Sequence, residues 1–438
     1  MMAKTAPADP TKGVPTRTLV LHPDLRQKED RRSATDALEE ALALARALPG
    51  LEIAGNSVVP LPRPHPGMLF GQGNVDVLKA RIKEDEIDLV LIDGPVTPVQ
   101  QRNLEKAWGV KLLDRTSLIL EIFADRAATR EGVLQVELAA LSYQRTRLVR
   151  AWTHLERQRG GLGFVGGPGE TQIEADRRAI DEAITRIKRQ LAKVVKTRSL
   201  HRAARAKVPY PVVALVGYTN AGKSTLFNRL TGAEVMAKDM LFATLDPTMR
   251  AVQLPDGGPE VILSDTVGFI SDLPTQLVAA FRATLEEVLD ADLIIHVRDV
   301  SHPETETQAK DVAQILEDLG VPDTRPQLEL WNKIDQVEDP SPWLTAAERS
   351  DTKFAVSALT GRGLEPALTA ISAAIEAPKQ TAMLYIPFPE GAARAWLFEA
   401  NVVLLEHTED DGNSLEVSWT DRQAAQFASR FPQVAQHR

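Results

Sequence analysis

A glycine-rich segment with a lysine and a hydroxyl side chain follows an apolar run near the middle of the chain. It matches the pattern G-x-x-x-x-G-K-[ST] with Gly217, Tyr218, Thr219, Asn220, Ala221, Gly222, Lys223 and Ser224, and Thr225 comes next. Such glycines let main-chain N–H groups surround phosphate oxygens, assisted by the N-terminus of the following helix. Lys223 would supply positive charge to the β- and γ-phosphates, and the Ser224 hydroxyl would ligate Mg²⁺. The segment predicts a nucleoside triphosphate site.

A second motif would distinguish guanine from adenine. After the apolar run 328–331 come Asn332, Lys333, Ile334 and Asp335. An acidic side chain can accept hydrogen bonds from N1–H and N2–H of guanine, and adenine offers neither in that arrangement. We expect Asp335 to bind the base, Lys333 to lie along it and Asn332 to brace the phosphate loop. Further along, Ser357 and Ala358 fit the main-chain contact to the guanine carbonyl.

Two further segments have the composition of switches that respond to the γ-phosphate. A strand-like run ends in Asp265-Thr266-Val267-Gly268, where Asp265 would hold Mg²⁺ through water and the Gly268 N–H would sense the γ-phosphate. In the earlier segment 242–248, we expect Thr244 to complete the metal shell, with Thr248 as the alternative. A threonine that only caps a turn would also fit this segment.

The residue after Gly268 predicts a slow enzyme. Ras-like GTPases have a glutamine there that orients the attacking water, but this chain has Phe269, whose ring has no donor or acceptor. Hydrolysis should therefore wait for a partner, or another residue, to position the water. Asn220 is one candidate, because several GTPases with asparagine at this position bind K⁺ beside the phosphates; an asparagine that braces the loop fits equally well. The predicted catalytic set is Lys223, Thr244, Gly268 and Asn220.

Alternating apolar runs and helical patterns predict a multidomain α/β protein. We expect a disordered tail at 1–15, an N-terminal α/β domain at 16–130, a helical hairpin at 131–206, a P-loop GTPase domain with a mainly parallel sheet at 207–378, and a small C-terminal α+β domain at 379–438. In the N-terminal domain, the pattern predicts strands at 18–21, 53–59, 88–92 and 110–113, and helices at 34–47, 74–83 and 98–107.

The expected hairpin has its own apolar period and its own charge. Two heptad-like seams run from Leu134 to Leu155 and from Ile173 to Val194, and the glycine-rich stretch 160–169 between them predicts the tip. Residues 141–210 hold 16 Lys and Arg against 6 Asp and Glu, although the whole chain has a net charge of −9. Such a split indicates a polyanionic partner, and a solvated helical surface would produce it as readily.

Composition limits the remaining possibilities. The absence of cysteine excludes disulfides, iron–sulfur clusters and cysteine-ligated zinc. No apolar run is long enough to span a bilayer, and the N-terminus lacks the apolar core of a signal peptide. We therefore expect a cytoplasmic protein without membrane insertion, acting as a monomer.

The combination of motifs resembles the HflX family of translation-associated GTPases, within the Obg–HflX group. The resemblance spans roughly residues 65–375 and rests on 71–75, 114–120, 160–163 with 167–172, and 242–248. The glycine-rich tip followed by Glu170-Thr171-Gln172 is its most specific part. It implies binding to the ribosome, chiefly to the large subunit near the peptidyl-transferase region. It also implies GTP-dependent splitting that rescues stalled ribosomes under stress.

A ribosomal partner would explain the basic hairpin, because a narrow tip can follow an RNA-lined channel while arginines meet phosphates. The expected RNA contacts are Arg145, Arg147, Arg150, Arg157, Arg159, Gly160, Gly161, Gly163, Arg177 and Arg178. Two alternatives stay open at this point. One is a checkpoint GTPase that binds the immature large subunit, and the other is a GTP-regulated interaction protein whose hairpin grips another protein as a coiled coil.

Overall fold

The chain folds into a multidomain α/β structure, as expected from the sequence. The computed structural model describes residues 15–25, 33–158, 168–205, 210–233, 241–242, 245, 248–255, 257–271, 287–322, 325–375, 379–400, 402–409 and 411–435. Two compact units are distinguished: Met1–Gln253 with Glu260–Ala367, and Leu254–Pro259 with Leu368–Arg438. The expected disordered tail lies outside the described residues, except for Pro15.

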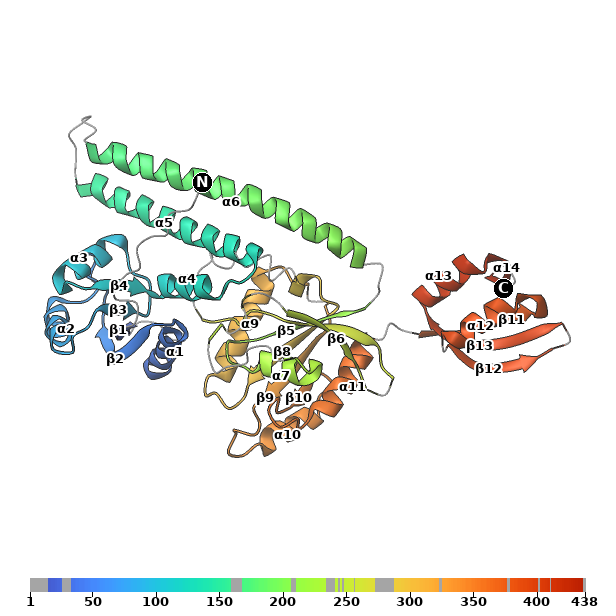
Figure 1. Ribbon diagram of the computed structural model, residues 1–438. Helices are drawn as coiled ribbons and strands as arrows, with labels where there is room; N and C mark the ends of the chain where they lie inside the picture. The colour runs from blue at the N-terminus through green and yellow to red at the C-terminus, as the bar shows by residue number, and fades with distance from the viewer. Residues whose placement is uncertain are drawn as a thin grey trace. The chain divides into compact units, whose positions relative to one another are not determined.

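The N-terminal part of the first unit is built on a parallel sheet with the strand order β2-β1-β3-β4 (Figure 1). Its strands are β1 (Thr16–Leu25), β2 (Leu51–Leu61), β3 (Leu89–Ile92) and β4 (Lys111–Asp114), and its helices are α1 (Ala34–Ala47), α2 (Gln72–Glu84), α3 (Pro98–Trp108) and α4 (Arg115–Arg126). Local chemistry sets the ends of α3: Thr97 and Gln100 form a capping box, and Gly109 closes the helix at φ 77°. The predicted helix 34–47 has the observed bounds, and α4 was not predicted.

Two long helices, α5 (Arg130–Gln158) and α6 (Pro168–Arg205), lie side by side as an antiparallel hairpin (Figure 1). The predicted apolar seam of α6 faces its partner, because Ile187 is buried while Lys188 and Arg189 beside it are exposed. Most of the predicted tip, residues 160–167, lies outside the described residues. The hairpin therefore presents one polar face of α6 to the surroundings.

The rest of the first unit surrounds a six-stranded sheet with the order β10-β9-β8-β5-β7-β6. Its strands are β5 (Val212–Val216), β6 (Thr248–Gln253), β7 (Glu260–Asp265), β8 (Leu293–Asp299), β9 (Gln327–Asn332) and β10 (Lys353–Ala355). Its helices are α7 (Lys223–Thr231), α9 (Thr305–Asp318), α10 (Ser341–Glu348) and the start of α11 (Leu364–Ile375), which continues into the second unit from Leu368. Among the described strands of this sheet, only β6 runs antiparallel to its neighbour. The carboxyl ends of β5, β7, β8 and β9 therefore meet at one edge, where ligands of such sheets bind.

A continuous apolar core joins the N-terminal sheet to the GTPase-type sheet. Leu38 of α1 and Phe123 of α4 belong to the same buried cluster as Val216, Phe242 and Phe269. Helix α4 buries one face: Leu118, Ile119, Ile122 and Phe123 are buried, while Glu121, Ala124 and Asp125 are exposed.

The second unit has an antiparallel sheet with the order β11-β13-β12. It contains β11 (Lys379–Pro387), β12 (Val403–Thr408), β13 (Gly412–Thr420), a 3₁₀ turn at Phe388–Glu390, α12 (Gly391–Glu399), α13 (Asp421–Arg430) and α14 (Pro432–Ala435). The helices cover one face of the sheet, where Phe427 packs between Trp419 and Phe431. The predicted α+β class is confirmed. Among the described helices, none combines the length and hydrophobicity needed to cross a membrane.

Candidate nucleotide site

The glycine-rich loop connects β5 to α7, as a phosphate loop requires. Gly222 has φ 96°, and a Cβ atom there would stand 2.2 Å from the Nδ2 atom of Asn332. A side chain at this position would be strained by the backbone and would collide with the guanine-motif asparagine. The loop therefore needs glycine where it turns into the helix. With glycine there, the backbone can curve so that its N–H groups point toward a bound phosphate.

Lys223 is buried at the first position of α7. Its Nζ atom donates to the carbonyls of Gly217 at 3.0 Å and Tyr218 at 2.9 Å. Burial lowers the pKa of Lys223 to about 8, and the nearby charge of Asp265 opposes this shift. An ammonium group has three donors, so the two loop carbonyls orient it while one donor remains for a phosphate oxygen.

Ser224 and Asp265 form the predicted metal site. The Ser224 hydroxyl donates to Oδ2 of Asp265 at 2.7 Å, and Asp265 is completely buried at the end of β7. A hydroxyl oxygen next to a carboxylate oxygen is the donor set that Mg²⁺ prefers, so these residues fit the ion. Thr244 lies outside the described residues. The alternative, Thr248, begins β6 and pairs in register with Asp265.

The guanine motif follows β9 and is braced from two sides. Asn332 is buried; its Nδ2 atom donates to the Ala221 carbonyl at 2.8 Å, and its Oδ1 atom accepts from the Ala358 N–H at 2.8 Å. This side chain therefore ties the phosphate loop to the 357–358 segment, as the expected bracing role requires. The Ala358 N–H is engaged by Asn332 here, so a contact from this N–H to the guanine carbonyl would have to share it.

The other two guanine-motif residues differ in their surroundings. The Lys333 ammonium pairs with Oδ2 of Asp299 at 2.7 Å, which fixes the aliphatic stem that would lie along the base. Asp335 is exposed, in the position expected of a carboxylate that binds a ligand from solvent. Ser357 is fully buried and accepts from the Thr360 N–H at 3.0 Å, which shapes the loop after β10.

The second switch lies directly against the phosphate loop. The Phe269 N–H donates to the Gly217 carbonyl at 3.1 Å, and the Thr219 N–H donates to the Phe269 carbonyl at 2.7 Å. A Cβ atom at Gly268 would stand 3.1 Å from Lys223 Nζ and 2.8 Å from a methyl of Thr219, so only glycine fits this close approach. The Phe269 ring is buried in the shared core. It supplies packing, and another group must orient water.

Asn220 occupies the tip of the phosphate loop. It is exposed and has φ 59°, a left-handed conformation that asparagine tolerates better than most residues. Both roles expected for it, K⁺ ligation and loop bracing, stay predictions.

Sequence reasoning missed three residues that shape this site. Asp299 ends the buried strand β8, and its place at the same sheet edge as Asn332 could have drawn attention to it. Arg229 at the end of α7 donates from Nε to the Ala358 carbonyl at 2.6 Å and so holds the guanine-side loop. Arg115 reaches this part of the molecule from the N-terminal sheet, and no spacing in the sequence indicated it.

The arginines predicted to contact RNA fall into different environments. Arg145, Arg177 and Arg178 are exposed on the hairpin, although each has an acidic neighbour. Arg147 corrects the prediction: its side chain is only 18% exposed, and it pairs with Asp114 at 2.9 Å and donates to the Val96 carbonyl. It joins the hairpin to the N-terminal sheet and is not presented to a partner. The side chains of Arg150 and Arg157, and all of 159–163, lie outside the description.

Fold and site together define a P-loop protein specific for guanine nucleotides. Comparisons with known proteins agree. Family models match residues 35–124 ("GTP-binding GTPase N-terminal"), 126–205 ("GTP-binding GTPase Middle Region"), 212–333 ("50S ribosome-binding GTPase") and 343–438 ("HflX C-terminal domain"). The chain belongs to the HflX family of GTPases, and it is a GTP hydrolase.

Individual relatives extend over most of the chain. "GTPase HflX" of Magnetococcus marinus is 51% identical over 91% of this chain and 92% of its own length. "GTPase HflX" of Escherichia coli is 44% identical over 81% of this chain and 83% of its own length. Among solved structures, a GTP-binding protein from Sulfolobus solfataricus in complex with GDP is 25% identical, with a TM-score of 0.44 over 82% of this chain and 98% of that chain.

Proposed function

We propose that this GTPase binds the ribosome, chiefly its large subunit, and uses GTP binding and hydrolysis to split or rescue stalled ribosomes under stress. The proposal places the protein in the cytoplasm, where it acts as a monomer. The observation that carries it is the basic face of the hairpin. The description of the family model matched by 212–333, "50S ribosome-binding GTPase", supports the same partner.

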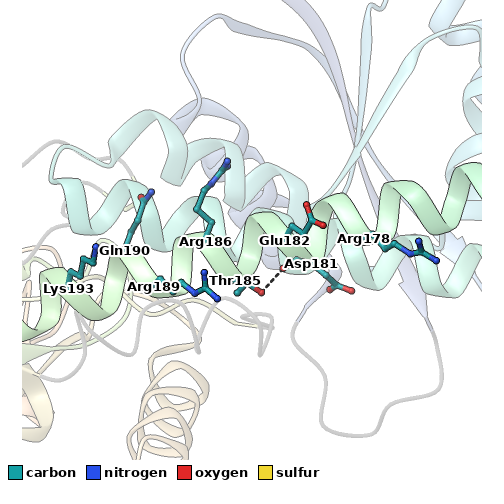
Figure 2. A pocket seen from close by; sticks show the side chains of 8 residues that line it. All are labelled: Arg178, Asp181, Glu182, Thr185, Arg186, Arg189, Gln190 and Lys193. Atoms are coloured by element: carbon teal, nitrogen blue, oxygen red, sulfur yellow. Dashed lines mark hydrogen bonds between the residues drawn. The ribbon is translucent and has the colours of Figure 1, made fainter.

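The basic face lies on α6. A shallow groove there is lined by Arg178, Asp181, Glu182, Thr185, Arg186, Arg189, Gln190 and Lys193, whose side chains project from one helix (Figure 2). Arg186, Arg189 and Lys193 are all exposed and recur at helical spacing. Cations and hydrogen-bond donors in one row suit the phosphates and 2′-hydroxyls of RNA better than an apolar partner helix. This face replaces Arg147 in the proposed RNA surface.

Cosedimentation tests the proposal directly. The full chain is centrifuged through sucrose gradients with intact ribosomes and with separated subunits, in GDP and in a non-hydrolysable GTP analogue. We expect binding to the large subunit with the analogue, conversion of intact ribosomes into subunits, and a GTPase rate that rises with ribosomes. No binding and no stimulation would remove the proposal. Binding to immature large subunits alone would favour the assembly checkpoint.

Charge reversal distinguishes an RNA surface from a coiled-coil surface. Arg186→Glu with Arg189→Glu should weaken ribosome binding by about a hundredfold and flatten its dependence on salt, since each lost phosphate contact reduces the slope of log affinity against log salt by about one. The matched control is Lys310→Glu with Arg349→Glu, the same charge change at exposed positions of the GTPase part. Equal effects of the two pairs would contradict a specific role for α6.

For the reaction itself, we propose that Ser224, Asp265 and Thr244 hold Mg²⁺, which would neutralise charge developing on the phosphates. We also propose that Asn220 binds K⁺ beside them. Replacing Na⁺ by K⁺ should then accelerate GTP turnover by about tenfold, in the range of one added electrostatic contact in the transition state. Asn220→Ala should abolish the difference between the two ions while retaining GDP binding. Equal rates in Na⁺ and K⁺ for the unchanged chain would contradict the K⁺ site.

A further inference from the structure

The phosphate loop has a side chain that contacts helix α1 of the N-terminal part. Tyr218 is buried, and its hydroxyl donates to a carboxylate oxygen of Glu40 on α1. The same hydroxyl accepts from the Ser271 N–H at 2.8 Å and lies 2.8 Å from the Ser271 Oγ atom. Ser271 follows the second switch by three residues. One phenol therefore joins the loop, the switch and α1.

Arg115 completes the contact from the first position of α4. Its guanidinium donates to the Ser271 carbonyl at 3.0 Å, to Asp93 at 2.6 Å and to the second oxygen of Glu40. Arg115 is buried between the carboxylates of Glu40 and Asp93. Removing one of these charges would leave the others buried without full compensation, which is destabilising. We call Glu40, Arg115, Tyr218 and Ser271 the relay. The N–H and carbonyl of Ser271 both bond to the relay, and its Oγ atom also donates to Asp311 of α9 at 2.8 Å.

The first switch touches the same N-terminal helix. The ring of Phe242, two residues before Thr244, packs edge-on against Phe123 of α4, with 4.6 Å between ring centres. Phe242 is buried and adopts φ 56°, a conformation that is costly for a large side chain. Helix α4 thus contacts both switch segments, one at each end, through Arg115 and Phe123.

We propose that Glu40 and Arg115 are positioning residues for γ-phosphate recognition: through Tyr218 and Ser271 they hold the second switch against the phosphate loop, and so favour GTP over GDP. Binding of the γ-phosphate requires this switch to be ordered, whereas binding of GDP does not. A segment that the N-terminal domain has already ordered costs less to bind, and the saving falls on GTP alone. The coupling is reciprocal: the factor by which the docked N-terminal domain raises the affinity for GTP is also the factor by which bound GTP strengthens the docking.

The test uses the full chain without ribosomes, so its result is independent of the proposed ribosomal role. Affinities for fluorescent GDP and for a non-hydrolysable GTP analogue are measured for Tyr218→Phe, Glu40→Gln and the double variant. Each single variant should lower the affinity for the analogue by about tenfold, which is the effect of losing one hydrogen bond to a charged group. The affinity for GDP should fall by less than about twofold. The double variant should lose less than the sum of the two single variants, because both remove the same bond between Tyr218 and Glu40.

Tyr143→Phe is the matched control. Its hydroxyl also donates to a carboxylate, that of Asp114, but this pair lies entirely outside the GTPase part. It should leave the ratio of the two affinities unchanged, and thermal melting should show that all variants fold. Equal losses of affinity for GDP and for the analogue would show that the relay has only a structural role. Tighter binding of the analogue, or additive losses in the double variant, would also overturn the proposal. Ser271→Ala provides a second variant, which retains the main-chain bonds to Arg115 and Tyr218 and should show a smaller shift of the same sign.

Discussion

Lys223→Ala should lower the affinity for both GTP and GDP by about a hundred- to a thousandfold, which corresponds to about 3–4 kcal/mol. The lysine is buried and held by two loop carbonyls, so its charge can reach the phosphates without reorganisation. Titration with fluorescent nucleotides measures the loss. Lys310→Ala, an exposed lysine on α9, is the control and should bind normally. An unchanged affinity of Lys223→Ala would contradict the phosphate-loop assignment.

The pH dependence of binding offers an independent view of the same ammonium group. Burial lowers the pKa of Lys223 to about 8, and phosphate binding requires the charged form. Below this pKa the amine is already protonated, so affinity should be constant. Above it binding must take up a proton, and the dissociation constant should rise by up to about tenfold per pH unit. Titrations between about pH 6.5 and 9 would show the bend, and a flat profile through pH 8 would contradict the shifted pKa.

Asp335→Asn should convert a GTP-binding protein into one that prefers XTP. The carboxylate would accept two charge-assisted hydrogen bonds from guanine, each of about 1.5 kcal/mol. Losing them should lower the affinity for GTP by at least about a hundredfold. Xanthine has a carbonyl where guanine has its amine, so the amide NH₂ of asparagine gains an acceptor. Competition of GTP and XTP against a fluorescent nucleotide measures both changes.

The control for this change of nucleotide preference is Asp351→Asn, a substitution at another exposed aspartate of the GTPase part. It should leave the order of preference unchanged. If Asp335→Asn still binds GTP far better than XTP, the base is recognised elsewhere, and Lys333 with its partner Asp299 becomes the first place to look.

Local patterns were sufficient for much of the fold. Helix 34–47 was predicted because its apolar residues recur at helical spacing. The strands of the N-terminal sheet were predicted because short apolar runs are typical of strands buried in a parallel sheet, and the two hairpin seams have the period of packed helices. Helix α4 was missed because its apolar residues form a short run, 118–123, that fits a buried strand as well as a helix. In the structure Leu118, Ile119 and Phe123 are buried in the core, while Glu121 within the run is exposed.

The nucleotide residues were predictable because phosphate and guanine impose fixed residue types at fixed spacings. The relay was not, since Glu40 and Tyr218 are separated by 178 positions and no motif joins them. Tyr218 itself was expected only as a loop residue. Arg147 shows the opposite failure: a count of charges assigned it to RNA, but its guanidinium is bound by Asp114 and three neighbouring groups. Composition shows that charge is present, and only packing shows whether it is available.

The length of α6 has a mechanical consequence. Its 38 residues form a rod about 57 Å long, at a rise of about 1.5 Å per residue. The C-terminal end of this rod, Arg205, precedes the first residue of β5 by seven positions, and β5 leads straight into the phosphate loop. A rotation of one degree about that end would displace the other by about 1 Å. The helix therefore has the dimensions of a lever arm, in which a small rotation at one end becomes a larger displacement at the other.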